Sequence, residues 1–252
     1  MIFSSIFSAF MQLVFKPQIL IPMIVLVLAS AAVVEVSGTI LERPLNDFTL
    51  NAVAPTTDNI LGMFLFNYPL EILGMVVIGS IMLGVGIIAW MSTTRMAKGE
   101  GLAKAVNTSV LEGGKTIGLV ILFWAIFIIA GTALLLATGL SMIESTVGMI
   151  ATIIVLIILF VVFVKLSFVF PALINKELKK ALQESWKFTN KKFWGTVALI
   201  IIAGIIALVL GVVLSQIGIL IGGFADPILS ALGDAVGGTY FVAAVTNYFY
   251  SK

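Results

Sequence analysis

The sequence predicts an all-α membrane protein, a polytopic bundle of transmembrane helices with about six spans. Three observations lead to this prediction. Hydrophobic residues make up 61% of the 252 residues. Charged residues make up only 10%, against about 25% in an ordinary soluble domain. The apolar runs also fill nearly the whole chain and leave no room for a separate soluble domain, so we expect one integral membrane domain over residues 1–252.

Six apolar segments are long enough, or nearly long enough, to cross a bilayer, which takes roughly 20 mainly apolar residues. In chain order they cover residues 18–36, 69–92, 116–138, 147–170, 193–217 and 227–248. The sixth has the weakest pattern, because Asp234 and the glycines Gly233, Gly237 and Gly238 interrupt its first half. A re-entrant or partly unwound segment is the alternative there.

The distribution of Lys and Arg between the loops predicts the orientation. If the loops after the second and fourth spans are cytoplasmic, the cytoplasmic side carries 13 basic residues and the other side only Arg43. The positive-inside rule therefore predicts a multi-pass protein of the cell membrane with both termini in the cytoplasm. The long external segment 37–68 carries an apolar patch at 61–66, and we favour a cap resting on the bilayer over a ligand lid.

The segments that follow the second and fourth spans form an internal repeat with a period of 76 residues. Each copy places its apolar residues on one helical face, which predicts short amphipathic helices on the cytoplasmic surface. The first face holds Leu102, Ala105, Val106 and Val110, and the second holds Leu178, Ala181, Leu182 and Trp186. The N-terminal stripe of Phe3, Phe7 and Phe10 fits a third, diverged copy. The parallel repeat units would then cover about 1–92, 97–170 and 174–252.

Basic and aromatic residues on and after these helices suit the headgroup zone of an anionic leaflet. The candidate headgroup contacts are Lys104, Lys115, Lys180, Lys187, Lys191, Trp186 and Trp194. Membrane lipids are the expected partners. Small residues along the spans favour helix–helix contact, either within the chain or between subunits, over the lining of a pore, and a homo-oligomer or a membrane-protein partner is the second expectation. Nucleic acid is not expected, because the potential of the inner leaflet explains the basic residues.

The segments 170–172 (FPA), 178–185 (LKKALQES) and 191–194 (KKFW) resemble a known family. They are similar to the six-span membrane domain at the N-terminus of some glycerophosphodiester phosphodiesterases and in related uncharacterised bacterial and archaeal membrane proteins. The resemblance implies a six-helix integral membrane protein over the whole chain. The soluble catalytic domain of those enzymes is not among these residues, so the resemblance implies no phosphodiesterase activity here.

The composition and motifs argue against an enzyme. With no His and no Cys, the chain has no zinc site built on those residues, no Cys nucleophile and no Ser-His-Asp triad. The glycine motifs at 84–89 and 113–116 resemble nucleotide-binding loops, but no strand precedes either one. We therefore expect no catalytic residue, no metal and no cofactor.

Ionisable residues at membrane depth are candidates for a polar pathway. Asp234 is the strongest, since it lies among small residues inside the sixth span, although it could instead mark the start of a shorter span. The other candidates are Asp226, Glu71 and Glu35, at the outer ends of spans. Lys165 lies close enough to the cytoplasmic boundary to snorkel.

Two functions follow from these observations. The first is a non-catalytic membrane protein that engages lipids or a membrane partner and self-associates. The alternative is a transporter or channel for a small solute, ion or amphiphile, with Asp234 in the pathway. A membrane-lipid partner is common to the first function and to the amphiphile version of the second.

Overall fold

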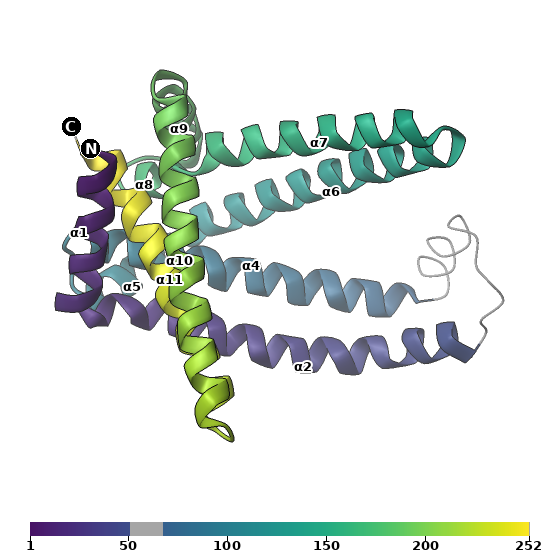
Figure 1. Cartoon of the computed structure of the whole chain (residues 1–252), viewed down its shortest axis with the longest axis horizontal. Helices are drawn as coiled ribbons and strands as arrows, with labels where there is room; N and C mark the ends of the chain where they lie inside the picture. The colour runs from purple at the N-terminus through teal and green to yellow at the C-terminus, as the bar shows by residue number, and fades with distance from the viewer. Residues whose placement is uncertain (51–67, 252) are drawn as a thin grey trace.

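The computed structural model describes residues 1–50 and 68–251 (Figure 1), with the backbone alone at 41, 43–50 and 141–143. The predicted apolar patch at 61–66 lies outside the described residues. All regular structure in the described part is helical, which confirms the all-α prediction. The helices are α1 (Ile2–Phe15), α2 (Ile21–Leu50), α4 (Pro69–Ala97), α5 (Leu102–Leu111), α6 (Gly113–Ile143), α7 (Ser145–Leu166), α8 (Val169–Leu173), α9 (Leu178–Lys191), α10 (Phe193–Ile221) and α11 (Ala225–Tyr250), with a short 3₁₀ helix η1 (Pro17–Leu20) before α2.

Within the described residues, six helical segments are long and apolar enough to cross a membrane. They are Pro17–Ile40, Pro69–Ala97, Gly113–Leu140, Ser145–Leu173, Phe193–Ile221 and Ala225–Tyr250. They coincide with the six predicted segments, so the number and places of the candidate spans are confirmed. The first helix continues past its predicted end at residue 36, so much of the predicted external segment is the end of α2.

The alternative of a partly unwound sixth span is wrong, because α11 is a continuous helix. Its glycines serve close packing, since Gly233 and Gly237 lie directly against the backbone of α10. The break in the helix comes earlier, at Gly222 and Gly223, whose φ angles of 74° and 61° suit glycine. These two residues form the turn between α10 and α11.

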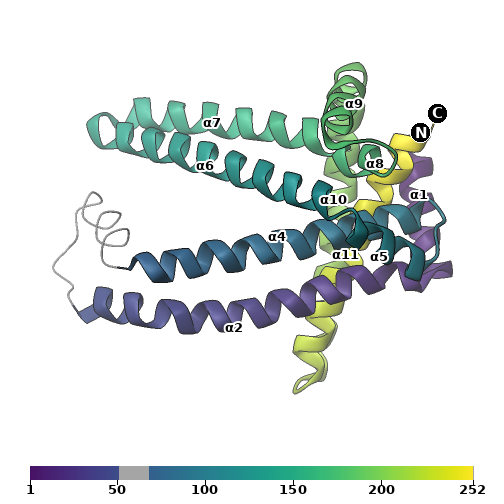
Figure 2. The same cartoon turned by 180° about the vertical axis from the view of Figure 1, so that it is seen from behind.

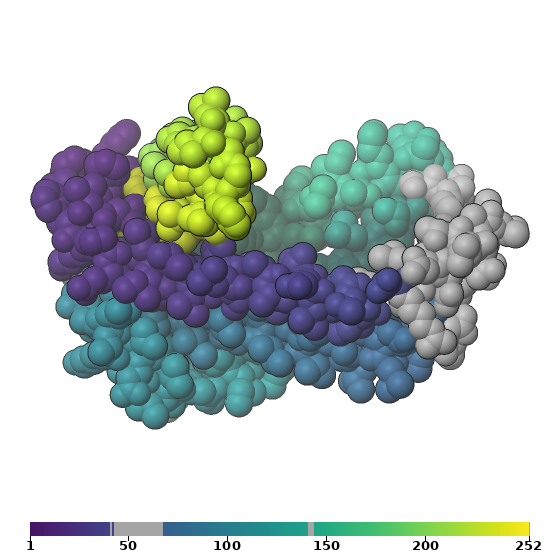
Figure 3. Space-filling view, turned by 90° about the horizontal axis from the view of Figure 1, so that it is seen from below, coloured from purple at the N-terminus to yellow at the C-terminus, as the bar shows by residue number. Residues whose placement is uncertain are grey.

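The spans form three hairpins, α2 with α4, α6 with α7, and α10 with α11. Figures 1 and 2 show α2, α4, α6 and α7 running alongside one another, while the α10–α11 hairpin crosses them at one end. The short helices α1, α5, α8 and α9 and both termini gather at this same end. In Figure 3, a notch separates the yellow-green atoms of the crossing hairpin from the teal α6–α7 hairpin. The sequence contained no signal for this crossing.

The best-packed part of the molecule lies where the three hairpins meet. Trp90 of α4 packs against Phe170 of α8 and Phe241 of α11, with ring centroids 5.1 and 6.2 Å away. In the most apolar 18-residue stretch of α11, 50% of the residues are buried. In the corresponding stretch of α6, only 6% are buried. The helix α11 is therefore the centre of the fold, and the α6–α7 hairpin is the part most available to lipid.

The short surface helices bury small residues most deeply. Of the predicted inner faces, Ala105 and Ala181 are fully buried, whereas Leu102, Leu178 and Leu182 are only partly buried. The buried residues are Ser5 and Ala9 in α1, Ala105 and Ser109 in α5, and Ala181, Ser185 and Thr189 in α9. Small side chains allow a helix to lie close to its neighbour, and the buried hydroxyls bond to backbone carbonyls. Val110 and Trp186, predicted on the same faces, are instead about half exposed, at 52% and 48%.

Candidate functional site

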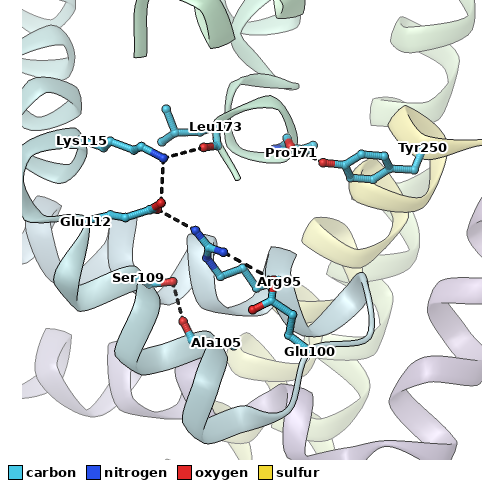
Figure 4. Close-up of polar contacts among 9 residues, drawn as sticks. All are labelled: Arg95, Glu100, Ala105, Ser109, Glu112, Lys115, Pro171, Leu173 and Tyr250. Carbon is cyan, nitrogen blue, oxygen red and sulfur yellow. Dashed lines mark hydrogen bonds and ion pairs between the residues drawn. The ribbon is translucent and has the colours of Figure 1, made fainter. Parts of the chain in front are cut away.

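A buried arginine at the end of α4 organises the polar contacts on the side of the surface helices (Figure 4). Arg95 is only 4% exposed. Its Nη2 lies 2.7 Å from Glu112 Oε2, and its Nη1 lies 3.5 Å from Glu100 Oε1. Glu100 follows α4 directly, and Glu112 stands between α5 and α6. The arginine therefore fixes the position of α5 from both of its ends.

The network continues from Glu112 to the second hairpin. Lys115 Nζ donates to Glu112 Oε1 at 2.7 Å and to the carbonyl of Leu173, at the end of α8, at 3.1 Å. Two cations and two carboxylates thus balance one another in a mostly buried place, which is the condition under which buried charge is tolerated. On the other side of α8, the hydroxyl of Tyr250 donates to the carbonyl of Pro171 at 2.6 Å. These contacts hold α4, α6, α8 and α11 together at one end of the spans.

Sequence reasoning missed this network as a group. It treated Lys115 as a headgroup contact, whereas the structure places its amine among protein acceptors. Arg95 was counted only among the basic residues of the cytoplasmic side, and Glu100 was not singled out. The available signal was the spacing of Glu112 and Lys115, which are three residues apart and therefore neighbours on a helical turn.

The other predicted headgroup contacts lie on the surface. Lys104 on α5 and Lys180, Lys187 and Lys191 on α9 are all exposed. Trp194 is 79% exposed at the start of α10. Basic and aromatic side chains at one end of a set of apolar helices match the composition of a membrane interface.

Lys165 and Trp186 interact directly. The amine of Lys165 lies 5.0 Å from the centre of the Trp186 ring and 6.0 Å from that of Phe193. A cation over an aromatic face keeps favourable electrostatic contact at a position where water is scarce. The expected snorkelling of Lys165 therefore ends among aromatic side chains, with the lysine residue only 9% exposed.

The four polar-pathway candidates occupy separate places. Asp234 and Asp226 are on α11, Glu71 is in the first turn of α4 and Glu35 is on α2. Among the described residues, no hydrogen bond or ion pair joins any two of these four side chains. The described part of the chain also holds no group of three acidic side chains that could bind a metal.

Asp234 nevertheless has a polar environment of its own. It is exposed on the wall of a hollow of about 410 Å³ between α10 and α11. Ser215, Gln216 and Ser230 line the same hollow. Asp226 lies instead at the close contact of the two helices, where its backbone touches Gly218. Of the four candidates, Asp234 therefore has the surroundings best suited to a polar ligand.

An apolar hollow of about 660 Å³ lies between the first two hairpins, beside the aromatic cluster. Its walls come from α4, α6 and α7, and its end is formed by Trp90, Phe170 and Phe241. Its volume is in the range of small-molecule sites, roughly 300–1,000 Å³. The sequence did not predict this hollow, because it depends on the spacing between helices that are far apart in the chain.

Comparison with known proteins gives one match. Residues 139–249 match the family described as the membrane domain of glycerophosphoryl diester phosphodiesterase. The matched region contains α7, α8, α9, α10 and nearly all of α11, and it includes the three segments that carry the resemblance in the sequence. The resemblance is thereby confirmed for somewhat less than half of the chain. No curated protein and no solved structure is similar enough to count as a match.

Proposed function

We propose that this chain is a non-catalytic membrane protein that engages lipids at its surface helices and self-associates through its spans. The observation that carries the proposal is the exposed basic and aromatic surface of α5, α9 and the start of α10. This surface lies at the same end of the spans as the aromatic cluster and the apolar hollow. Cationic side chains next to apolar grooves suit an anionic amphiphile, with its headgroup and chains in separate surroundings.

Self-association draws support from glycines on the outside of the spans. Gly84 and Gly204 have open space where a side chain would begin, whereas Gly211 and Gly218 are already used within the α10–α11 hairpin. Free glycines let a second helix approach closely in the membrane. We place both termini in the cytoplasm, on the strength of the Lys and Arg distribution.

Native mass spectrometry of the protein released gently from its own membrane tests the proposal. We expect a defined oligomer that retains specific lipids. The triple variant Lys180→Gln, Lys187→Gln, Lys191→Gln should lose anionic lipids preferentially, because it removes three of the four exposed lysines of α9. A lipid-free monomer would overturn both parts of the proposal.

The second candidate function is transport of a small solute, ion or amphiphile through a path that includes Asp234. The polar hollow around Asp234 favours it, because an exposed carboxylate within a candidate span is costly without a role. Asp234→Asn should then reduce flux in liposomes by about tenfold or more, which corresponds to a loss of ~1.4 kcal/mol or more in the contact with the transported solute. Unchanged flux would remove Asp234 from the pathway.

A further inference from the structure

A second apolar groove, of about 640 Å³, lies between α2, α4 and α5, next to the surface helices. Ten of its twelve lining residues are apolar, among them Val25 of α2, Ile88 of α4 and Val106 of α5. The two exceptions are Ser92 and Asn107. The groove therefore has an apolar wall along the spans and polar groups near the end of the spans.

The hydroxyl of Ser92 is the unusual feature of this groove. Ser92 is 1% exposed, and within the described residues its Oγ has no hydrogen-bond partner. Its near neighbour Thr94 satisfies its own hydroxyl by donating to the carbonyl of Trp90 at 2.7 Å. Five buried hydroxyls in the described residues lack a hydrogen-bond partner, and Ser92 is the one among them that lines this groove. A buried hydroxyl without a partner is unfavourable, so a ligand in the groove that offered an acceptor to Ser92 would be stabilised there.

One exposed cation, Lys104, lies on α5 next to residues that line the groove, without lining it itself. Asn107 lines the groove from α5, and Lys104 lies three residues earlier, so the two side chains are neighbours on the helix surface. Glu100 and Glu112, the acids that flank α5, are engaged by Arg95. Lys104 is exposed and, among the described residues, has no ion pair. It is free to bind an anion at this place.

We propose that this groove binds one molecule of an anionic phospholipid from the leaflet on the side of the surface helices. One acyl chain lies along Val25, Ile88 and Val106. The Ser92 hydroxyl donates to an ester carbonyl, and Lys104 with Asn107 contacts the phosphate. The inference rests on the proposed lipid-engaging function and adds a defined site and a lipid class.

The dimensions and chemistry of the groove favour a lipid over a protein helix. A helix with its side chains is about 10–12 Å across and needs a wide surface to dock. A groove of 640 Å³ between two spans and a surface helix has the size of a small-ligand site, roughly 300–1,000 Å³. Its two polar lining residues, Ser92 and Asn107, stand among ten apolar ones, which suits a ligand that is mostly apolar with one polar end.

Photolabelling of the purified full chain in vesicles tests the site. The probe is phosphatidylglycerol with a diazirine in one acyl chain, compared with the same probe made from phosphatidylcholine. We expect labelled peptides from α2, α4 and α5 around the groove. Val25→Trp should reduce this labelling by about tenfold, because the indole fills the groove, and a loss of this size corresponds to ~1.4 kcal/mol of binding free energy.

The matched control is Val34→Trp on the same helix. Val25 and Val34 are 54% and 72% exposed, and Val34 is not part of the groove, so the control should keep full labelling. Ser92→Ala should reduce labelling by about threefold to tenfold, the range for loss of one hydrogen bond. Lys104→Gln should remove the preference for phosphatidylglycerol over phosphatidylcholine.

The outcomes separate this site from the broader proposal. Labelling at the groove that survives Val25→Trp, or labelling spread evenly over all exposed spans, would overturn the site. If native mass spectrometry still finds retained lipids in that case, the proposed function stands without this groove. The absence of any retained lipid would overturn both.

Discussion

At the scale of single residues, the most consequential group is the buried guanidinium of Arg95. A charge at 4% exposure is tolerated only when partners replace the water that it has lost. Here two carboxylates do so, and the closer one, Glu112, is shared with Lys115. The arrangement connects the end of the first hairpin to the second, and its two Arg95 ion pairs hold both ends of α5.

Removing the shared carboxylate should therefore destabilise the fold. Glu112→Gln leaves Arg95 with only the longer contact to Glu100 and deprives Lys115 of its carboxylate. Breaking a buried ion pair in this way costs about 3–5 kcal/mol, and partial exposure of Glu112 places this case at the lower end. Thermal unfolding in detergent, followed by circular dichroism, measures the loss.

The control for this variant is Glu184→Gln. Its pair with Lys176 is far more exposed, with side-chain accessibilities of 36% and 42%. Such a surface pair contributes only about 0–1 kcal/mol. Equal losses for the two variants would show that the Arg95 network does not hold the hairpins together.

At the scale of elements, the α10–α11 hairpin shows how backbone contact replaces side-chain packing in a membrane. A Cβ added at Gly233 would lie 2.7 Å from the carbonyl oxygen of Gly211, and one at Gly237 would lie 2.7 Å from that of Ala207. In lipid, where the hydrophobic effect gives no preference for helix contact, such close approach is a main source of association. The same glycines made the sixth span look discontinuous in the sequence.

The contact between the two helices is not symmetric, which gives a sharp test. Gly233→Ala should separate α10 from α11 and lower stability by about 1–3 kcal/mol, as overpacking does. Gly211→Ala faces the same contact, but its added Cβ meets nothing closer than 3.7 Å and should be tolerated. Thermal melts of the two variants in one detergent compare them directly. A larger loss for Gly211→Ala would contradict the close packing described here.

At the scale of the whole molecule, each surface helix packs against the last helix of a hairpin. The helix α5 packs on α4, α9 packs on α7 and α8, and α1 packs on α11. The third contact joins the start of the chain to its end, so the three contacts close a ring. The small residues buried at Ser5, Ala105 and Ala181 occupy corresponding places in the three helices. The predicted repeat stays a prediction, and this ring is the arrangement to which it would give rise.

The sequence predicted those features that depend on residues close together in the chain, and it did not predict those that depend on packing between distant helices. The spans follow from apolar runs of sufficient length, and the surface helices follow from the spacing of residues such as Leu102 and Leu178. The pairing of Arg95 with Glu112 and the groove beside Ser92 depend on how separate helices pack, and no local pattern encodes that. The headgroup candidates were predicted from side-chain type alone, which is why Lys115 could not be told apart from Lys104.

The closure of the ring also bears on self-association, because α1 could pack on the α11 of its own chain or of a second copy. Gln12 and Asn247 mark this contact, with their side-chain amides 3.3–3.5 Å apart. The chain has no cysteine, so the double variant Gln12→Cys, Asn247→Cys provides the only two thiols for a short bismaleimide. We expect a crosslink within one chain, seen as a peptide pair by mass spectrometry without a dimer band.

The control is the pair Gln12→Cys, Gln216→Cys, in which the second thiol lies toward the far end of α10. This pair should not react. A dimer band from the first pair alone would instead mean that the α10–α11 hairpin docks on a neighbouring copy, and that the crossing hairpin is itself the means of assembly.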